Sequence, residues 1–196
     1  MMANMGRDCL QPMAGRTVLV TGGGSGGIGK ATALGLPTMG AHVAITGRDR
    51  TRTGDAAREI HAATGGRVAV FVADHSSQSE LRSLADEVLR RLRSIDLLVN
   101  NVGGYWRTRN IAVDGLERTF ALNHLAPFLL TDLLLDRLIQ SAPARVVTVA
   151  SHTQATGRID FDDLQGERSY PGARAYSQRP IMKTPAQGAA TSIPVA

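Results

Sequence analysis

Short apolar segments alternate along the chain with longer segments in which apolar residues recur at helical spacing. Runs rich in apolar and β-branched residues predict buried strands over residues 17–20, 41–46, 67–73, 95–100 and 145–150. Helical spacing predicts helices over residues 55–63 and 78–92, and over a long region from about 114 to 141. This alternation predicts an α/β fold, a doubly wound parallel sheet with helices on both faces. Ligands of such a fold bind at the carboxyl ends of the strands.

A glycine-rich turn follows the first of these strands. The stretch Thr21 to Thr32 reads TGGGSGGIGKAT, and the residues after it are compatible with a helix. Glycines let the backbone approach an anion closely, and the unpaired N–H groups of a helix's first turn attract it, so the stretch predicts a phosphate site. The glycines fit a dinucleotide-binding turn of the G-x-x-x-G-x-G type in a Rossmann-type fold, at Gly22, Gly26, Gly27 and Gly29.

The same stretch also matches the spacing of a nucleoside triphosphatase loop. Gly24 to Lys30 reads GSGGIGK, which fits G-x-x-x-x-G-K. That motif continues with a Ser or Thr whose hydroxyl coordinates magnesium, and here the next residue is Ala31. Thr32 is one residue further along, which turns its side chain by about 100° on a helix. The sequence therefore favours the dinucleotide turn.

Composition narrows the possible partners. The chain has 196 residues, 43% apolar and 20% charged, which is typical of one globular domain. Its formal net charge is +5, but the arginines are interleaved with Asp and Glu, so we expect no nucleic-acid partner. The single cysteine, Cys9, excludes an internal disulfide and fits a reducing compartment. We expect a cytoplasmic protein with no membrane span, no signal peptide and no metal site.

The residues after the second strand bear on the choice of cofactor. That strand ends in Thr46-Gly47-Arg48-Asp49. A carboxylate at this place would bind a free ribose 2′-hydroxyl, whereas an arginine favours a 2′-phosphate. Arg48 therefore predicts a preference for NADP(H), while the adjacent Asp49 keeps NAD(H) possible. The later strands are followed by further polar or glycine-rich stretches: Asp74, Asn100-Asn101-Val102-Gly103-Gly104 and Ser151.

Taken together, these motifs resemble the short-chain dehydrogenase/reductase family. The resemblance rests on TGGGSGGIGKA, Asp74, NNVGG, Asn123 in FALNHLAPFLLT, the serine of VVTVAS and Tyr176 of AYSQ, and it covers roughly residues 15–178. Three stretches are similar to the retinol-dehydrogenase-like branch, which generally prefers NADP(H): NHLAPFLLT, SHTQATGRIDFDDLQGERSY and the Arg-Asp pair after the second strand.

The resemblance implies a reversible hydride transfer between NADP(H) and an apolar alcohol, aldehyde or ketone. It makes Tyr176 the general acid and base, Ser151 the hydrogen-bonding partner of the carbonyl oxygen, and Asn123 part of a proton relay. A homo-oligomer through the helices that contain Asn123 and Tyr176 is possible. The cofactor residues that it implies are Gly22, Gly26, Gly27, Ile28, Gly29, Arg48, Asp74, Asn100, Asn101 and Gly103.

The chain departs from the family pattern after Tyr176. The family has a lysine four residues later, where it favours the phenolate and binds the nicotinamide ribose. Here Pro180 stands at that position, Lys183 follows three residues on, and residues 179–189 are similar to a segment that the family carries further downstream. We therefore expect an internal truncation after Gln178, with the C-terminal strands missing. The alternative prediction is a non-catalytic dinucleotide-binding fragment or a pseudoenzyme that lacks the active-site lysine.

These observations define three expected parts of the chain and two local distortions. We expect a flexible N-terminal extension over residues 1–14, a dinucleotide-binding domain over 15–178 and a remnant segment over 179–196. The glycine turn has four residues between Thr-Gly and Gly-Ile-Gly where the family has three, so we expect it to bulge by one residue. Pro37 falls where the first crossover helix should still be running, and near the end of that helix it could act as a stop.

Overall fold

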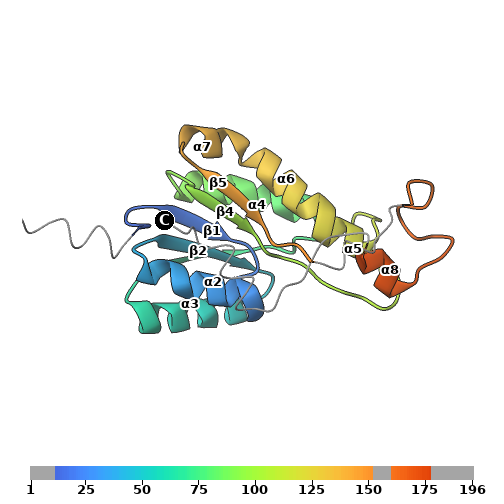
Figure 1. The fold of residues 1–196 in the computed structure, drawn as a ribbon, viewed down its shortest axis with the longest axis horizontal. Helices are drawn as coiled ribbons and strands as arrows, with labels where there is room; N and C mark the ends of the chain where they lie inside the picture. Colours follow the sequence, from blue (N-terminus) through green and yellow to red (C-terminus); the bar gives the residue numbers. More distant parts are fainter. Residues whose placement is uncertain (1–11, 152–159, 178–196) are drawn as a thin grey trace, which may run out of the picture.

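The predicted strands form one parallel sheet with the order β3-β2-β1-β4-β5 (Figure 1). The computed structural model describes residues 12–151 and 160–177. Because β1 lies between β2 and β4, the chain reverses direction across the sheet there, which places a crevice at the carboxyl ends of the central strands. The strands are β1 (Thr17–Val20), β2 (His42–Gly47), β3 (Val68–Val72), β4 (Leu97–Asn100) and β5 (Arg145–Thr148).

Helices cover both faces of the sheet, as the strand–helix alternation predicts. On one face lie α2 (Gly27–Thr38) and α3 (Arg50–Thr64), and on the other α4 (Gln78–Arg91), α6 (Ala126–Leu133) and α7 (Leu135–Gln140) (Figure 1). Successive strand residues point to opposite faces. Leu19 and Leu98 accordingly belong to the core beneath α4 and α6, whereas Val18, Val20 and Val99 belong to the core beneath α2 and α3. Burial on both faces explains why these strands read as continuous apolar runs.

Helix α3 begins earlier than the apolar spacing predicts. It starts at Arg50 instead of residue 55, because Asp49 has extended backbone angles and its carboxylate accepts the Arg52 N–H at 2.8 Å. It ends at Thr64 and is followed by Gly65, whose φ of 71° is the left-handed conformation that closes many helices. The first crossover helix, α2, includes Pro37 directly before its last residue, as expected.

The region from 114 to 141 is not one continuous helix. It contains α5 (Arg118–Phe120), a π-helical turn η1 (Ala121–Leu125), α6 and α7. The Ala126 N–H donates to the Ala121 carbonyl, five residues back, and Pro127 next to it has no N–H to donate. The wider turn inserts a residue into the helix at the position of Asn123, which no apolar spacing reveals.

A buried carboxylate anchors the segment from residue 160 to α8 (Gly172–Ser177). Glu117 is 0% exposed and caps α5 by accepting the N–H groups of Thr119 at 2.7 Å and Phe120 at 2.8 Å. Its carboxylate also accepts the Tyr170 hydroxyl at 2.9 Å, which ties the later segment to α5. Burial alone would raise the pKa of Glu117, but these donors outweigh it and the pKa lies below its usual value. The ionised Glu117 thereby holds in place the segment that carries Tyr176.

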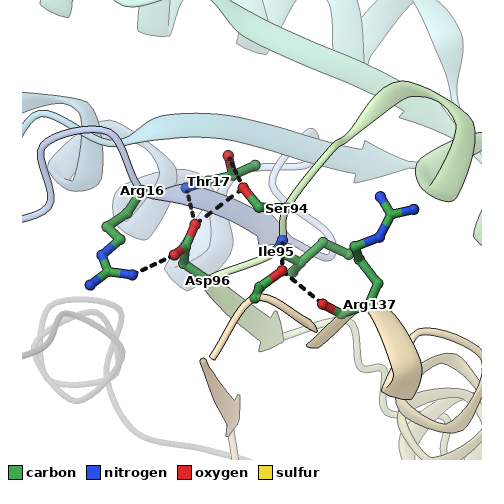
Figure 2. A network of polar contacts seen from close by, with 7 residues as sticks. Arg16, Thr17, Ser94, Ile95, Asp96 and Arg137 are labelled. Carbon is green, nitrogen blue, oxygen red and sulfur yellow. Dashed lines mark hydrogen bonds and ion pairs between the residues drawn. The ribbon is translucent and has the colours of Figure 1, made fainter. Parts of the chain in front are cut away.

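A second carboxylate joins β1 to β4 at the end of the sheet away from the glycine turn. Figure 2 shows Asp96 between Arg16 and Thr17: it pairs with the Arg16 guanidinium at 2.6 Å and accepts the Thr17 N–H at 2.8 Å. The Ser94 hydroxyl lies further off, at 3.4 Å from the same carboxylate. Nearby, the Ser141 hydroxyl accepts the Ile95 N–H at 3.0 Å.

We predict that Asp96→Ala lowers the free energy of unfolding by about 2 kcal/mol, because it leaves the Thr17 N–H without its partner and removes a partly buried ion pair. Urea unfolding followed by circular dichroism measures this change. The control Ser94→Ala removes only long hydrogen bonds and should cost about 0.5 kcal/mol or less. Equal destabilisation by the two variants would show that Asp96 does not hold these strands together.

Candidate functional site

The glycine turn occupies the crevice between β1 and α2. Gly22 has a φ of 71°, and a Cβ on it would lie only 3.0 Å from the side chains of Asn101 and Val102. Gly26 and Gly27 also have positive φ, 88° and 66°, and a Cβ on either would meet nothing within 4 Å. Gly26 and Gly27 are thus two consecutive residues with positive φ directly before and at the start of α2. Because α2 starts at Gly27 with no side-chain cap, the N–H groups of its first turn remain available to an anion.

Thr21 locks this turn to the loop that follows β4. Its hydroxyl, in a side chain only 2% exposed, accepts the N–H groups of Asn101 at 2.9 Å and Val102 at 3.0 Å. The Asn101 side-chain amide donates back to the Thr21 carbonyl at 2.8 Å. A Cβ on Gly29 would collide with the same Asn101 amide, so this glycine is required by the close approach of the two loops. Sequence reasoning missed Thr21, although its place at the very end of a strand is a signal.

A cleft of about 210 Å³ lies at the carboxyl ends of β1, β2, β3 and β4. Four of the predicted cofactor residues line it, each from the end of a different strand, namely Gly22, Arg48, Asp74 and Gly103. Among the lining residues that the sequence analysis did not predict are His75, Trp106 and Arg118. Gly26, Gly27, Ile28 and Gly29 lie beside the cleft in the turn and first helix and do not line it.

Charge of both signs meets in this cleft. Burial raises the pKa of Asp74, but hydrogen bonds from Ser76 and the nearby guanidinium groups of Arg118 and Arg48 outweigh it, so the net pKa is lowered. The Ser76 hydroxyl and N–H reach the Asp74 carboxylate at 2.7 and 2.8 Å. Arg118 lies over the Trp106 ring, 5.0 Å from its centroid. Arg48 is exposed, and in residues 12–151 and 160–177 no hydrogen-bonding or ion-pair partner engages its guanidinium.

His75 is the buried imidazole next to Asp74. It is 5% exposed, and its Nε2 lies 2.8 Å from the Thr46 hydroxyl. Burial lowers the pKa of His75 to about 4, which the adjacent Asp74 carboxylate offsets only in part. The imidazole is therefore neutral at physiological pH. No motif or spacing in the sequence identifies this histidine as a site residue, because its hydrogen-bonding partner, Thr46, lies in another strand.

Two of the predicted catalytic residues, Asn123 and Tyr176, contact neighbouring residues of the loop after β4. Asn123, within the π-helical turn, accepts the Gly104 N–H at 2.8 Å and donates to the Gly104 carbonyl at 2.9 Å. The next residue, Tyr105, packs edge-to-face on Tyr176 with ring centroids 5.2 Å apart. Tyr176 is 8% exposed, and its burial raises the pKa of the phenol. Ser151 is also buried, while Pro180 and Lys183 lie outside the described residues.

Asn100 differs in position from the other predicted cofactor residues. Its amide donates to the Thr131 hydroxyl at 3.0 Å, and it lines a second cavity of about 440 Å³ beside α6 and β5, not the cleft at the glycine turn. Asn123 lines the same second cavity. Among the described residues, no group of three His, Cys, Asp or Glu side chains could hold a metal ion, and each helix is too short or too polar to cross a membrane.

The sheet order, the glycine turn and the cleft at the strand ends define a doubly wound α/β fold of the type that binds dinucleotides. The chain belongs to the short-chain dehydrogenase family, since the sequence profile of that family matches residues 16–161. The family that the motifs resemble is therefore confirmed.

Curated relatives also support the predicted branch. Retinol dehydrogenase 12 of Mus musculus is 42% identical over 163 residues, which are 83% of this chain and 51% of that protein. A Streptomyces sp. (strain C5) protein with the provisional name daunorubicin C-13 ketoreductase DnrU is 39% identical, over 84% of this chain and 56% of its own length. This chain thus spans about half the length of the curated relatives that it matches.

Solved structures share the fold. An uncharacterised protein from Mycobacterium paratuberculosis is 38% identical with a TM-score of 0.72, over 84% of this chain and 57% of that one. The NADP active-site complex of Pseudomonas aeruginosa RhlG is 34% identical with a TM-score of 0.66, over 84% of this chain and 64% of that one. These likenesses confirm the doubly wound α/β fold.

We predict that acid destabilises the protein through His75. Its pKa of about 4 in the folded chain lies below the ordinary 6.5, so the unfolded chain binds the extra proton first. The contribution of His75 to stability should be lost as the pH drops from about 6.5 to about 4, by about 3 kcal/mol in total, while the lowered pKa values of Asp74 and Glu117 add a separate loss at lower pH. Urea unfolding at about pH 7.5 and about pH 5 measures this loss, and His75→Gln should reduce it by about 2 kcal/mol. An equal loss in the variant would assign the acid sensitivity to other groups.

Proposed function

We propose that this chain binds NADP(H) in the cleft and transfers hydride between it and an apolar alcohol, aldehyde or ketone. The observation that carries the proposal is the convergence of Gly22, Arg48, Asp74 and Gly103 from four strand ends on one cleft. Two similar proteins support it: the 34%-identical RhlG forms an active-site complex with NADP, and a 42%-identical relative is a retinol dehydrogenase. An apolar alcohol and the aldehyde formed from it both belong to the proposed substrate class.

The residues present fit a dinucleotide at the glycine turn. Gly22 lines the cleft with backbone atoms alone, and its positive φ and close approach to Asn101 and Val102 disfavour any side chain there. The uncapped N–H groups at the start of α2 supply hydrogen bonds to a pyrophosphate. Asp74 and the guanidinium of Arg118 offer polar groups to the rest of the nucleotide.

The engagement of Asp49 supports NADP(H) over NAD(H). Its carboxylate caps α3 by accepting the Arg52 N–H, so it is already committed to the helix and less available to a ribose 2′-hydroxyl. Arg48 beside it is exposed and lines the cleft, where its planar guanidinium suits a 2′-phosphate. We therefore propose that Arg48 sets the preference for NADP(H).

Bound NADP(H) would supply the hydride acceptor or donor at nicotinamide C4. Tyr176 would give its proton to the carbonyl oxygen in reduction, and the raised pKa keeps that phenol protonated at neutral pH. The Ser151 hydroxyl would hold the same oxygen by a hydrogen bond. Asn123 fixes Gly104 by its two hydrogen bonds and so positions Tyr105 against Tyr176. A protonated phenol favours reduction of a carbonyl over oxidation of an alcohol.

Three further statements remain predictions from the sequence: a cytoplasmic location, a homo-oligomer, and the domain limits at residues 14 and 178. The expected truncation after Gln178 falls outside the described residues. Binding of cofactor without turnover is the alternative function, and the two experiments below separate it from the proposed one.

We predict that Arg48→Ala weakens NADPH binding by about 10-fold to 30-fold, the loss expected for a charge-assisted hydrogen bond to phosphate. NADH binding should change by less than about twofold, because NADH has no 2′-phosphate. Fluorescence titration of the full chain with both cofactors measures the two affinities. The control Arg67→Ala removes an exposed arginine at the opposite end of β3 and should leave both unchanged. An equal loss for NADPH and NADH would refute a role in 2′-phosphate recognition.

We predict that Tyr176→Phe lowers carbonyl reduction by at least about 100-fold, as expected when a general acid is removed. The affinity for NADPH should stay within about twofold, since the ring and its packing on Tyr105 are retained. Steady-state reduction of an apolar aldehyde such as retinal, with NADPH oxidation followed by absorbance, measures the change. NADPH binding without turnover in the wild-type chain would favour the alternative function.

A further inference from the structure

The buried residue His75 has no role in the proposed hydride transfer. It follows β3, lines the dinucleotide cleft, and also lines a separate cavity of about 180 Å³ against α4 and α6. Buried apolar side chains such as Leu81 and Ala126 line that cavity together with His75. An imidazole kept there neutral gives up hydration that an apolar side chain would not lose. Its hydrogen bond to Thr46 is therefore the feature to be explained.

The Thr46 hydroxyl connects His75 to the first glycine of the turn. Thr46, at 0% exposed, accepts the Gly22 N–H at 3.2 Å and lies 2.8 Å from His75 Nε2. A hydroxyl has one proton, and it can satisfy that proton by donating it to Nε2. The hydroxyl then has its lone pairs directed at Gly22. The three groups form a continuous chain from β3 through β2 to the glycine turn.

Gly22 is the residue at which this chain can affect the cleft. Its positive φ turns the backbone sharply after β1, and its own atoms line the cleft. Thr21 holds the turn from the side of β4, through Asn101 and Val102. The Gly22 N–H has Thr46 as its partner on the side of β2. The turn is thus held from both neighbouring strands of the sheet.

We propose that His75 is a positioning residue for the dinucleotide site: by accepting the Thr46 hydroxyl proton, it fixes the hydroxyl that holds the Gly22 N–H. His75 does not contact the reacting atoms in this proposal and acts only through Thr46. The expected effect of His75 on cofactor affinity rests on the proposed function. The expected effect of His75 on the Gly22 backbone is independent of that function.

The test compares His75→Leu, which keeps most of the buried volume but removes the acceptor, with His75→Gln, whose terminal amide can replace Nε2. Amide hydrogen exchange of the cofactor-free full chain, followed by NMR, reads the Gly22 N–H directly. The Thr21 N–H, which donates to the Val99 carbonyl at 2.9 Å, is the internal reference. Fluorescence titration with NADPH reads the consequence for the cleft. Ser141→Ala is the matched control, because it removes a hydroxyl bound to the Ile95 N–H at the other end of the sheet.

We expect His75→Leu to speed exchange of the Gly22 amide by about tenfold relative to that of Thr21, and to weaken NADPH binding by about fivefold. His75→Gln should restore both to within about twofold of the wild type, and Ser141→Ala should leave both unchanged. These results together would separate positioning from a general loss of stability.

Unchanged Gly22 exchange in His75→Leu, or failure of His75→Gln to restore it, would overturn the proposal. So would an equal effect of Ser141→Ala. If the wild-type chain bound neither NADPH nor NADH, the proposed function would fail, and the Gly22 exchange rates would still decide the role of His75. If the wild type bound NADPH and His75→Leu bound it equally well, the inference would fail and the proposed function would stand.

Discussion

The buried hydroxyl of Thr21 is the interaction on which the site depends. It accepts two backbone N–H groups from the loop after β4, while its own backbone continues β1 into the glycine turn. Two loops that are separated by about 80 residues in sequence are thereby fixed against each other. Because the loops lie so close together, positions 22 and 29 favour glycine, which has no side chain. The cleft has its shape because these loops cannot move apart without leaving two partly buried N–H groups unpaired.

The opposite side of the cleft depends on two carboxylates with different tasks. Asp74 remains ionised next to Arg48 and Arg118, where it faces the cleft. Glu117 is ionised although fully buried, because backbone and hydroxyl donors replace the water that it has lost. The first shapes the charge that a nucleotide would meet. The second positions the segment that carries Tyr176, one of the candidate catalytic residues, although Glu117 itself does not line the cleft.

Much of the fold could be predicted from the sequence, because the strands are buried on both faces and their apolar runs are continuous. The start of α3 could not be predicted from apolar spacing, because the Asp49 cap decides it. The break at Asn123 was also missed, since it depends on one backbone hydrogen bond from Ala126 to the Ala121 carbonyl. Local spacing describes which face a residue occupies and does not describe which backbone group it pairs with.

The candidate site was predicted where its residues lie in recognisable motifs and was missed where they do not. Gly22, Arg48, Asp74 and Gly103 follow strand ends, which the alternation of elements already locates. His75, Trp106 and Arg118 enter the same cleft from positions whose neighbours in space are distant in sequence. Asn100 shows the converse: it stands in a recognisable motif, yet its side chain lies beside Thr131 and a different cavity.

Trp106 gives the cleft an optical property of its own. It is the single tryptophan among 196 residues, and its ring lies beside Gly104 and beneath the Arg118 guanidinium. Indole emission responds to nearby charge and to contact with water. When the excitation wavelength lies beyond the absorption of the three tyrosines, the emission of the protein therefore comes from Trp106 alone, and an unlabelled sample reports on one known wall of the cleft.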